Sequence, residues 1–280
     1  MSSILSSQRM VITDLDGTLL SSDRTVSLCD LTTLKSLETQ GIIRVIATGR
    51  SLYSAYRVLP KDFPIDYLVF SSGAGIVDWI RQELLLSCHL LRQEIEETTA
   101  LLLQHGLDFM IHQAIPDNHH FWYHSTGQHN PDFIRRCDLY RDFASPFHES
   151  ILPLEQACQF LTIEPEKNAT PTYQMLKSSL PSLHVIRTTS PLDGTSSWFE
   201  IFPKSVSKAS ASEWLARRHR IAPANTLGLG NDYNDIEILQ WAGQSFVVAN
   251  APHDLKESYP VVASHNDNGF SDAVKKWISC

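Results

Sequence analysis

The sequence has no long hydrophobic run and no excess of positive charge, and each absence argues against a class of function. Its apolar runs fall short of the roughly 18 to 20 residues that a membrane-spanning helix needs. Its net charge of −8 argues against nucleic acid or an anionic membrane surface as the main partner. We therefore expect a protein that acts on neither.

Cysteine is also scarce, and no two cysteines form a C-x-x-C pair. The five cysteines lie at positions 29, 88, 137, 158 and 280. Their odd number and wide spacing predict reduced thiols rather than a disulfide framework or a zinc site. The N-terminal stretch MSSILSSQR lacks the apolar core of a signal peptide. These features together predict a cytoplasmic location.

Both ends of the sequence alternate between strand and helix patterns. Buried-strand patterns occur at 10–13, 42–50, 66–75, 225–230 and 245–250, and helical patterns at 27–40, 206–219 and 236–242. A polar helix is also expected directly after residue 50. Strand–helix–strand units of this length predict a parallel sheet covered by helices, and hence an α/β fold.

The middle of the chain differs from both ends. It is richer in proline, histidine and aromatic residues, and it mixes helical stretches such as 91–106 with short strands such as 183–190 and 197–202. We therefore expect an α+β domain at 86–202, inserted into a catalytic core formed by residues 1–85 and 203–280.

Polar side chains follow several of the predicted strands. Asp14 and Asp16 come directly after the first strand, Thr48 follows the second, and a polar cluster at 230–235 follows a late one. Asp-x-Asp-Gly suits a solvated turn, but it also suits a catalytic pair of carboxylates. Because ligands bind beyond the carboxyl ends of parallel strands, these residues are expected to converge in one crevice.

Four motifs in order resemble those of the haloacid dehalogenase superfamily, and within it the Cof-type sugar-phosphate phosphatases with a large cap domain. They are VITDLDGTLL, VIATGR, PKSVSKASA and GLGNDYNDIEIL, and the later stretches VVANAPHDLK and NDNGFSDAV fit the same family. The resemblance covers the two ends of the chain, while the middle matches the cap in position and size only. It implies a Rossmann-like core with an inserted cap that sets substrate specificity.

The resemblance also implies a reaction. It predicts a Mg²⁺-dependent phosphatase that hydrolyses small phosphate monoesters, above all phosphosugars, through an aspartyl-phosphate. Asp14 would attack phosphorus, and Asp16 would protonate the leaving oxygen and then activate water. Mg²⁺ would be bound by the Asp14 carboxylate and the Asp16 backbone carbonyl.

Further residues would bind the phosphoryl group. Thr48 and Gly49 match the second motif and would contact the transferring group, and Lys208 in the third motif would neutralise its charge. Lys204 lies near enough in sequence to be a substitute. Without the other motifs, Lys208 would be interpreted as a solvated helix lysine and Thr48 as a hydroxyl that caps a turn.

The fourth motif departs from the family pattern Gly-Asp-x-x-Asn-Asp. The chain has Gly230-Asn231-Asp232-Tyr233-Asn234-Asp235, so Asn231 stands where the family has a metal-binding aspartate. Three alternatives follow: Asn231 ligates the metal, Asp232 replaces it through a one-residue shift of the loop, or the metal site is weakened. Asn234 would contact the phosphoryl oxygens or position the loop. Asp235 would hold Lys208 or a metal-bound water.

The predicted cap contains a group of histidines close to aromatic residues. These are His112, His119, His120, His124 and His129, beside Phe121, Trp122 and Tyr123. A metal- or sugar-binding patch and a polar hairpin with core aromatics both fit this composition. The spacing matches no zinc pattern, which favours the hairpin.

Two alternative functions remain on the same scaffold. A sugar phosphomutase would return the phosphoryl group to a sugar instead of to water. A non-catalytic protein that binds phosphate esters would follow if Asn231 has made the metal site degenerate. Turnover of a phosphate ester to inorganic phosphate distinguishes the leading function from both.

Overall fold

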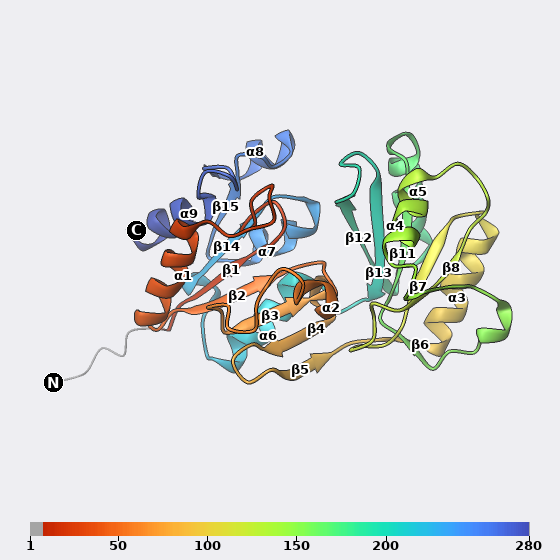
Figure 1. The fold of residues 1–280 in the computed structure, drawn as a ribbon, viewed down its shortest axis with the longest axis horizontal. Coiled ribbons are helices and arrows are strands. Elements are labelled where there is room, and N and C mark those ends of the chain that lie inside the picture. Colours follow the sequence, from red (N-terminus) through yellow and green to blue (C-terminus); the bar gives the residue numbers. More distant parts are fainter. Residues whose placement is uncertain (1–7, 280) are drawn as a thin grey trace. The chain divides into compact units, whose positions relative to one another are not determined.

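The computed structural model describes residues 8–279, which divide into two compact units (Figure 1). The first, which we call the core unit, contains the chain up to Leu86 and the chain from Ser207 onward. The second, the inserted unit, is Ser87–Val206. The units divide after Leu86 and after Val206.

The core unit is built on one sheet whose central strands are parallel. Within the described residues the strand order is β16-β15-β14-β1-β2-β3-β4-β5, and β4 pairs antiparallel with β3. The strands are β1 Met10–Thr13, β2 Ile43–Ala47, β3 Tyr67–Phe70, β4 Gly75–Asp78, β5 Glu83–Ser87, β14 Thr226–Gly230, β15 Gln244–Val248 and β16 Val261–Val262. The parallel sheet confirms the predicted α/β class.

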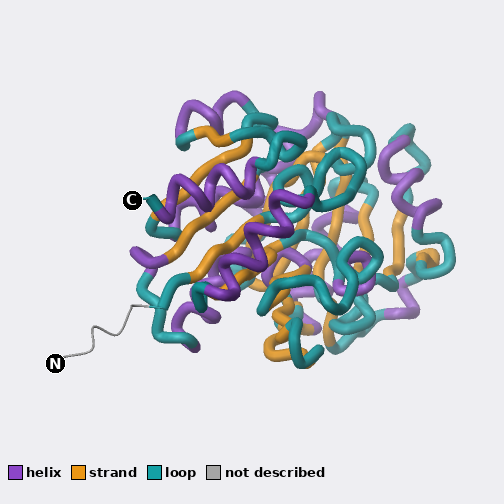
Figure 2. Tube along the Cα trace, turned by 60° about the vertical axis from the view of Figure 1, so that its left-hand side comes forward, coloured by secondary structure: helices purple, strands orange, loops and turns teal. Residues whose placement is uncertain are grey.

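Helices cover both faces of this sheet, as Figure 2 shows. On one face α1 and α9 pack side by side, and on the other α6 and α7 pack together. The helices of the unit are α1 Leu28–Thr39, α2 Leu52–Ala55, α6 Lys208–Arg218, α7 Ile236–Trp241, α8 His253–Ser258 and α9 Gly269–Ile278. Because both faces are covered, the central strands are apolar at nearly every position rather than at alternate ones.

Local sequence signals explain where the helices begin and end. The Ser27 hydroxyl caps α1 by accepting from the Asp30 amide, and Gly41 follows the helix with a φ of +69°. The Ser207 hydroxyl caps α6 by accepting from the Ser210 amide. The polar helix expected after residue 50 is only the short α2, Leu52–Ala55.

The inserted unit is a smaller α+β structure. Within the described residues it holds a sheet of order β12-β13-β11-β7-β8-β9 and a two-stranded pair, β10-β6. The strands are β6 Leu90–Leu91, β7 Phe109–His112, β8 Phe121–His124, β9 Ala144–Pro146, β10 Gln156–Ala157, β11 Gln159–Glu164, β12 Leu183–Thr189 and β13 Ser197–Pro203. The helices are α3 Arg92–Gln104, α4 Pro131–Leu139 and α5 Glu166–Ser179.

Two apolar clusters form on opposite faces of the inserted sheet. Phe160 and Phe199 belong to the cluster that includes side chains of α3 and α5. Leu161 and Trp198, their neighbours in sequence, belong to the cluster that includes Phe133 of α4. The alternation follows from the two-residue period of a strand, and it gives the unit its own core.

One histidine of the inserted unit, His112, is a packed core residue. Its Nδ1 lies 2.8 Å from the Asn118 carbonyl oxygen, and its ring packs on Phe121. Burial, with the nearby charge of Arg136, lowers the pKa of His112 to about 3. His112 is therefore neutral near pH 7 and acts as a structural group.

No helix of residues 8–279 combines the length and apolarity needed to cross a bilayer.

Candidate active site

Three adjacent strands of the core sheet end in the predicted site residues. β1 lies between β14 and β2, and Asp14, Gly230 and Thr48 stand at or just beyond their carboxyl ends. The Asp14 amide donates to Leu229 O (2.9 Å), and the Thr48 amide donates to Val69 O (2.9 Å). These bonds extend the parallel pairing past the strands and fix the residues at one edge.

A buried charge cluster lies at this edge. Lys208 Nζ donates to Asp14 Oδ1 and to Asp235 Oδ1, both at 2.7 Å. The Lys208 side chain is only 1% exposed, the Asp235 side chain 1% and the Asp14 side chain 8%. Two carboxylates therefore share one ammonium away from water, where electrostatic interactions are strong.

The pKa values reflect this imbalance. Burial raises the pKa of Asp14 to about 7, helped by the negative charges of Asp235 and Asp16 and opposed by Lys208. Burial would lower the pKa of Lys208, but the attraction of Asp14 and Asp235 outweighs it and raises that pKa. Lys208 thus stays protonated, while Asp14 is a carboxyl group whose charge depends on its surroundings.

Asp235 organises the loop that carries the fourth motif. Its Oδ2 accepts from the amides of Asn231 (2.8 Å) and Asp232 (3.1 Å), while its Oδ1 holds Lys208. A Cβ on Gly230 would lie 2.4 Å from the Asp235 Cβ, so only glycine fits there. Of the two roles expected for Asp235, the contacts favour holding Lys208.

The loop after β3 places Lys208. Gly73 has a φ of +106°, and a Cβ there would lie 2.1 Å from the Ser207 carbonyl oxygen. Ser71 and Ser72 precede it with φ values of +48° and +53°, a conformation that L residues adopt at a cost of roughly 1–2 kcal/mol each. The backbone thus approaches the first turn of α6 closely and holds Lys208 toward Asp14.

The Asn231 amide faces the two aspartates of the first motif. One end of the amide lies 2.9 Å from Thr18 Oγ1 and 3.1 Å from both Asp14 Oδ2 and the Asp16 carbonyl oxygen. If that end is nitrogen, all three oxygens lie within reach of its two N–H groups, which can donate to two of them at once. If it is oxygen, it accepts from the Thr18 hydroxyl and adds a third oxygen beside the other two.

Arg50 is a site residue that sequence reasoning missed. Its Nε donates to Asp16 Oδ2 (2.7 Å) and its Nη2 to Asp16 Oδ1 (2.6 Å), a two-pronged ion pair. Its Nη1 also donates to Ser54 O (3.2 Å). Arg50 directly follows Thr48-Gly49 in the second motif, and this adjacency is the signal that points to it.

Asn250 is a second residue that sequence reasoning missed. Its Nδ2 donates to the Gly17 carbonyl (2.8 Å), and its Oδ1 accepts from the His265 amide (3.1 Å). Asn266 Oδ1 accepts from the Ser22 amide (2.9 Å) nearby. The late stretches VVANAPHDLK and NDNGFSDAV therefore hold the loop that follows Asp16.

The remaining predicted residues lie at the same edge or in the neighbouring loop. Thr48 Oγ1 accepts from the Arg50 amide (3.1 Å), and Gly49 lies between them. Asn234 belongs to the short turn Tyr233–Asp235, next to Asp232. Lys204 donates to Leu183 O (3.5 Å) in the inserted unit, so Lys208 is the lysine that contacts Asp14.

The oxygens at the site suit a hard divalent cation. Among residues 8–279 no three Cys, His, Asp or Glu side chains form a metal-binding group. A cation site here must therefore use backbone and amide oxygens besides a carboxylate. Asp14 Oδ2, the Asp16 carbonyl and the Asn231 amide supply such a set, which is the kind that Mg²⁺ accepts.

A cavity of about 660 Å³ lies elsewhere in the core unit. Asp66, Tyr67 and Asp78 are among its lining residues, at the amino end of β3 and the paired end of β4. It includes none of the predicted site residues. Ligands of open parallel sheets bind at the carboxyl ends of the strands, so we assign the chemistry to the edge that holds Asp14.

Comparison with known proteins gives relatives and solved structures that include phosphatases. The HMP-PP phosphatase of Serratia proteamaculans is 24% identical over 285 residues, which cover 96% of this chain and 95% of that protein. A phosphatase of the haloalkanoate (HAD) enzyme superfamily from Bacteroides thetaiotaomicron superposes with a TM-score of 0.78 at 19% identity, over 100% of this chain and 98% of that one.

A second solved structure of similar fold is that of a HAD subclass IIB sugar phosphatase. It superposes with a TM-score of 0.75 at 18% identity, over 98% of this chain and all of that one. At such identities the two structures establish a shared fold. The sequence pattern of the haloacid dehalogenase-like hydrolases matches residues 11–278, nearly the whole chain. The protein is therefore a member of the haloacid dehalogenase-like hydrolase family.

Proposed function

We propose that the protein is a Mg²⁺-dependent phosphatase that hydrolyses small phosphate monoesters, above all phosphosugars, through an aspartyl-phosphate. The observation that carries this proposal is the buried contact of Asp14 with Lys208, itself held by Asp235. A carboxylate that only stabilised the fold would need no cation shared with a second acid. A nucleophile that attacks a phosphate dianion needs such a positive charge beside it.

Asp14 is the nucleophile in this proposal. Its Oδ1 forms a bond to phosphorus while the bond from phosphorus to the ester oxygen breaks. Lys208, 2.7 Å from Oδ1, orients this oxygen and neutralises charge as the phosphoryl group arrives. Thr48 and Gly49 at the end of β2, with Asn234, would contact the phosphoryl oxygens.

Asp16 is the acid and base. Its carboxyl gives a proton to the leaving oxygen, then takes a proton from the water that attacks phosphorus and releases Asp14. Its side chain is 43% exposed, which suits proton exchange with substrate and water. Arg50 holds both carboxylate oxygens, so Asp16 must release one of these two bonds in order to carry a proton, while the other bond keeps the carboxyl in place.

The metal would be held by Asp14 Oδ2, the Asp16 backbone carbonyl and the Asn231 amide oxygen. When bound, Mg²⁺ supplies charge that keeps Asp14 ionised and offsets its repulsion from phosphate. Ligation of the metal by the Asp16 backbone leaves its carboxyl free for proton transfer. Because the Asn231 amide reaches both aspartates, the contacts favour Asn231 over Asp232 as the third ligand.

The substrate class rests on the relatives. One relative is named as a phosphatase of HMP-PP, and a structural neighbour is titled a sugar phosphatase. Both names point to small phosphorylated metabolites, and we extend this to phosphosugars for the present chain. The inserted unit, residues 87–206, is proposed to select the organic part of the substrate.

The test is hydrolysis of p-nitrophenyl phosphate and a panel of phosphosugars, in EDTA and after addition of Mg²⁺. We expect turnover that requires Mg²⁺ and is lost in Asp14→Asn. Acid quenching with ³²P-labelled substrate should leave label on a peptide that contains Asp14. If no divalent metal gives inorganic phosphate, the hydrolase proposal is wrong. If label passes to a sugar instead of water, the protein is a mutase.

A further inference from the structure

The Asn231 amide lies where one of its atoms meets three oxygens. Thr18 Oγ1 is 2.9 Å away, and Asp14 Oδ2 and the Asp16 carbonyl are each 3.1 Å away. The Asp16 carbonyl oxygen, and the Asp14 carboxylate whenever it is ionised, can only accept hydrogen bonds. An amide nitrogen at this position satisfies both, and an amide oxygen satisfies neither unless a cation lies between them.

An aspartate at position 231 would have only one of these two abilities. Its carboxylate would ligate a cation well, but without a cation it would place a negative oxygen about 3 Å from Asp14 Oδ2. Asp14 and Asp235 already share a single buried lysine. A third carboxylate would add repulsion in a place with little water to screen it.

We propose that the Asn231 amide is a turnable ligand: its nitrogen bonds Asp14 and Asp16 when no divalent cation is bound, and its oxygen ligates the cation when one binds. This inference rests on the proposed Mg²⁺ site and deepens it. The metal-free site keeps its geometry because an amide nitrogen takes over the bridging of the two aspartates. The price is weaker metal binding than an aspartate would give.

The packing around the amide suits a half-turn about the Asn231 Cβ–Cγ bond, which exchanges the oxygen and nitrogen positions. A Cβ on Gly17 would lie 2.8 Å from the Asn231 Nδ2 position, so the loop backbone packs against the far end of the amide. Asn250 fixes that loop through the Gly17 carbonyl. The amide therefore exchanges its two ends in place rather than swinging out of the site.

The first measurement is a ¹⁵N-correlated NMR spectrum of the full-length protein, titrated with Mg²⁺. The Asn231 side-chain NH₂ pair is assigned by its loss in Asn231→Asp. We expect this pair to shift strongly with Mg²⁺, because its hydrogen-bond partners change. If Mg²⁺ binds by calorimetry and this pair does not move, the turn of the amide is wrong.

The second measurement compares Asn231→Asp, which adds one negative charge, with Asp232→Asn, which removes one negative charge from the next residue. We expect Asn231→Asp to bind Mg²⁺ about tenfold more tightly, because an added charge strengthens the ligand set. Its melting temperature should fall below that of the parent in EDTA and recover in Mg²⁺. Asp232→Asn should bind Mg²⁺ as the parent does.

The outcomes separate this inference from the proposed function. If Mg²⁺-dependent hydrolysis is present but Asp232→Asn, not Asn231→Asp, changes Mg²⁺ affinity, then Asp232 is the ligand and the turnable amide is wrong. If Mg²⁺ neither binds nor supports hydrolysis, the metal-dependent function and this inference fail together. If Asn231→Asp does not fold, the NMR titration of the parent still decides.

Discussion

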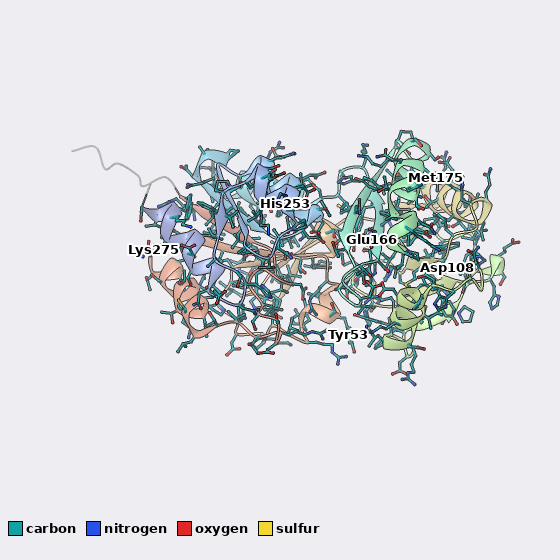
Figure 3. All side chains as sticks on the ribbon, turned by 90° about the horizontal axis from the view of Figure 1, so that it is seen from above. Tyr53, Asp108, Glu166, Met175, His253 and Lys275 are labelled. Carbon is teal, nitrogen blue, oxygen red and sulfur yellow. The ribbon has the colours of Figure 1, made fainter. Side chains whose placement is uncertain are left out.

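Two buried carboxylates, Asp14 in the core unit and Asp108 in the inserted unit, are bound in different ways. Asp14 shares a lysine with a second acid, and its pKa is raised to about 7. Asp108, labelled in Figure 3, accepts from the Thr126 amide (2.7 Å), the Thr126 hydroxyl (2.9 Å) and the Asn130 amide (3.1 Å). All three donors are neutral and belong to the same unit.

The difference indicates what each carboxylate does. These bonds join the loop before α4 to the segment between α3 and β7, where Asp108 lies. Asn130 also caps α4. Such a carboxylate stabilises a fold and has no reason to react. The buried negative charge of Asp14 is compensated only while Lys208 is present. This is the arrangement expected of a reactive group.

The largest effect is expected where the comparison is tested directly, with Asp14→Asn against Asp108→Asn. The first should lower the rate of phosphate release by on the order of 10⁴-fold or more while the protein stays folded. The second should keep the rate within a few fold but lower the free energy of unfolding by roughly 1–3 kcal/mol. Kinetics and urea denaturation of both variants measure this, and equal rate losses would contradict our assignment.

The next largest effect is expected for Lys208→Met. It leaves Asp14 and Asp235 buried without their cation, which should cost roughly 3–5 kcal/mol of unfolding free energy. The rate should also fall by about 10²- to 10³-fold. Lys204→Met is the control, because Lys204 Nζ donates to the Leu183 carbonyl oxygen in the inserted unit. A larger rate loss in the control would favour Lys204 as the phosphate-binding lysine.

A third prediction uses pH to compare the two carboxylates. The pKa of Asp14 is raised from 3.8 to about 7 in the folded protein, so folding takes up a proton between these values. Stability from this group is present below pH 4 and is lost as pH rises through 7, at up to about 1.4 kcal/mol per pH unit. The raised pKa of Lys208 adds nothing to this slope, since Lys208 stays protonated throughout the window.

The measurement is urea denaturation in EDTA at pH 5, 6, 7 and 8. Relative to Asp14→Asn, the parent should lose stability as pH rises across this range. Asp108→Asn keeps Asp14 and serves as the control variant, so its stability should fall with pH as that of the parent does. Parallel pH profiles of the parent and Asp14→Asn would show that Asp14 is ionised throughout and that Lys208 compensates its burial fully.

Much of the fold followed from patterns that depend on local sequence. The apolar runs that became β1, β2 and β14, and the helical periodicity of α1 and α6, report burial of strands and of one helix face. The helix expected after residue 50 proved short. A polar stretch has no apolar period to set its length, so the sequence there could not distinguish a helix from a turn.

The site was predictable where residues stand at strand ends, and less so where partners come from loops. Asp14 and Lys208 are 194 positions apart, and the motifs brought them together only through a family resemblance. Asn250 was missed because its role depends on the Gly17 carbonyl, and backbone acceptors leave no trace in sequence. Arg50 was missed because its partner is a side chain already assigned another role.

The smallest effect is expected for Arg50, which contacts Asp16 and is expected to act on the reaction through it. Arg50→Ala removes the two-pronged pair and lets the Asp16 carboxyl rotate away, which should lower kcat by roughly 10- to 100-fold. KM should change little if Arg50 positions Asp16, and should rise strongly if Arg50 mainly binds phosphate. Arg50→Lys should recover part of kcat, because one contact to Asp16 survives.

The control for this last prediction is Arg57→Ala, which removes the same charge from an exposed position seven residues away. Arg57 Nη1 donates to Tyr53 OH (3.5 Å), and Tyr53 is labelled in Figure 3. Equal losses in the two variants would mean that Arg50 contributes general positive charge. A loss confined to kcat of Arg50→Ala would mean that the core site positions its acid with a cation, whereas the inserted unit holds Asp108 with neutral donors.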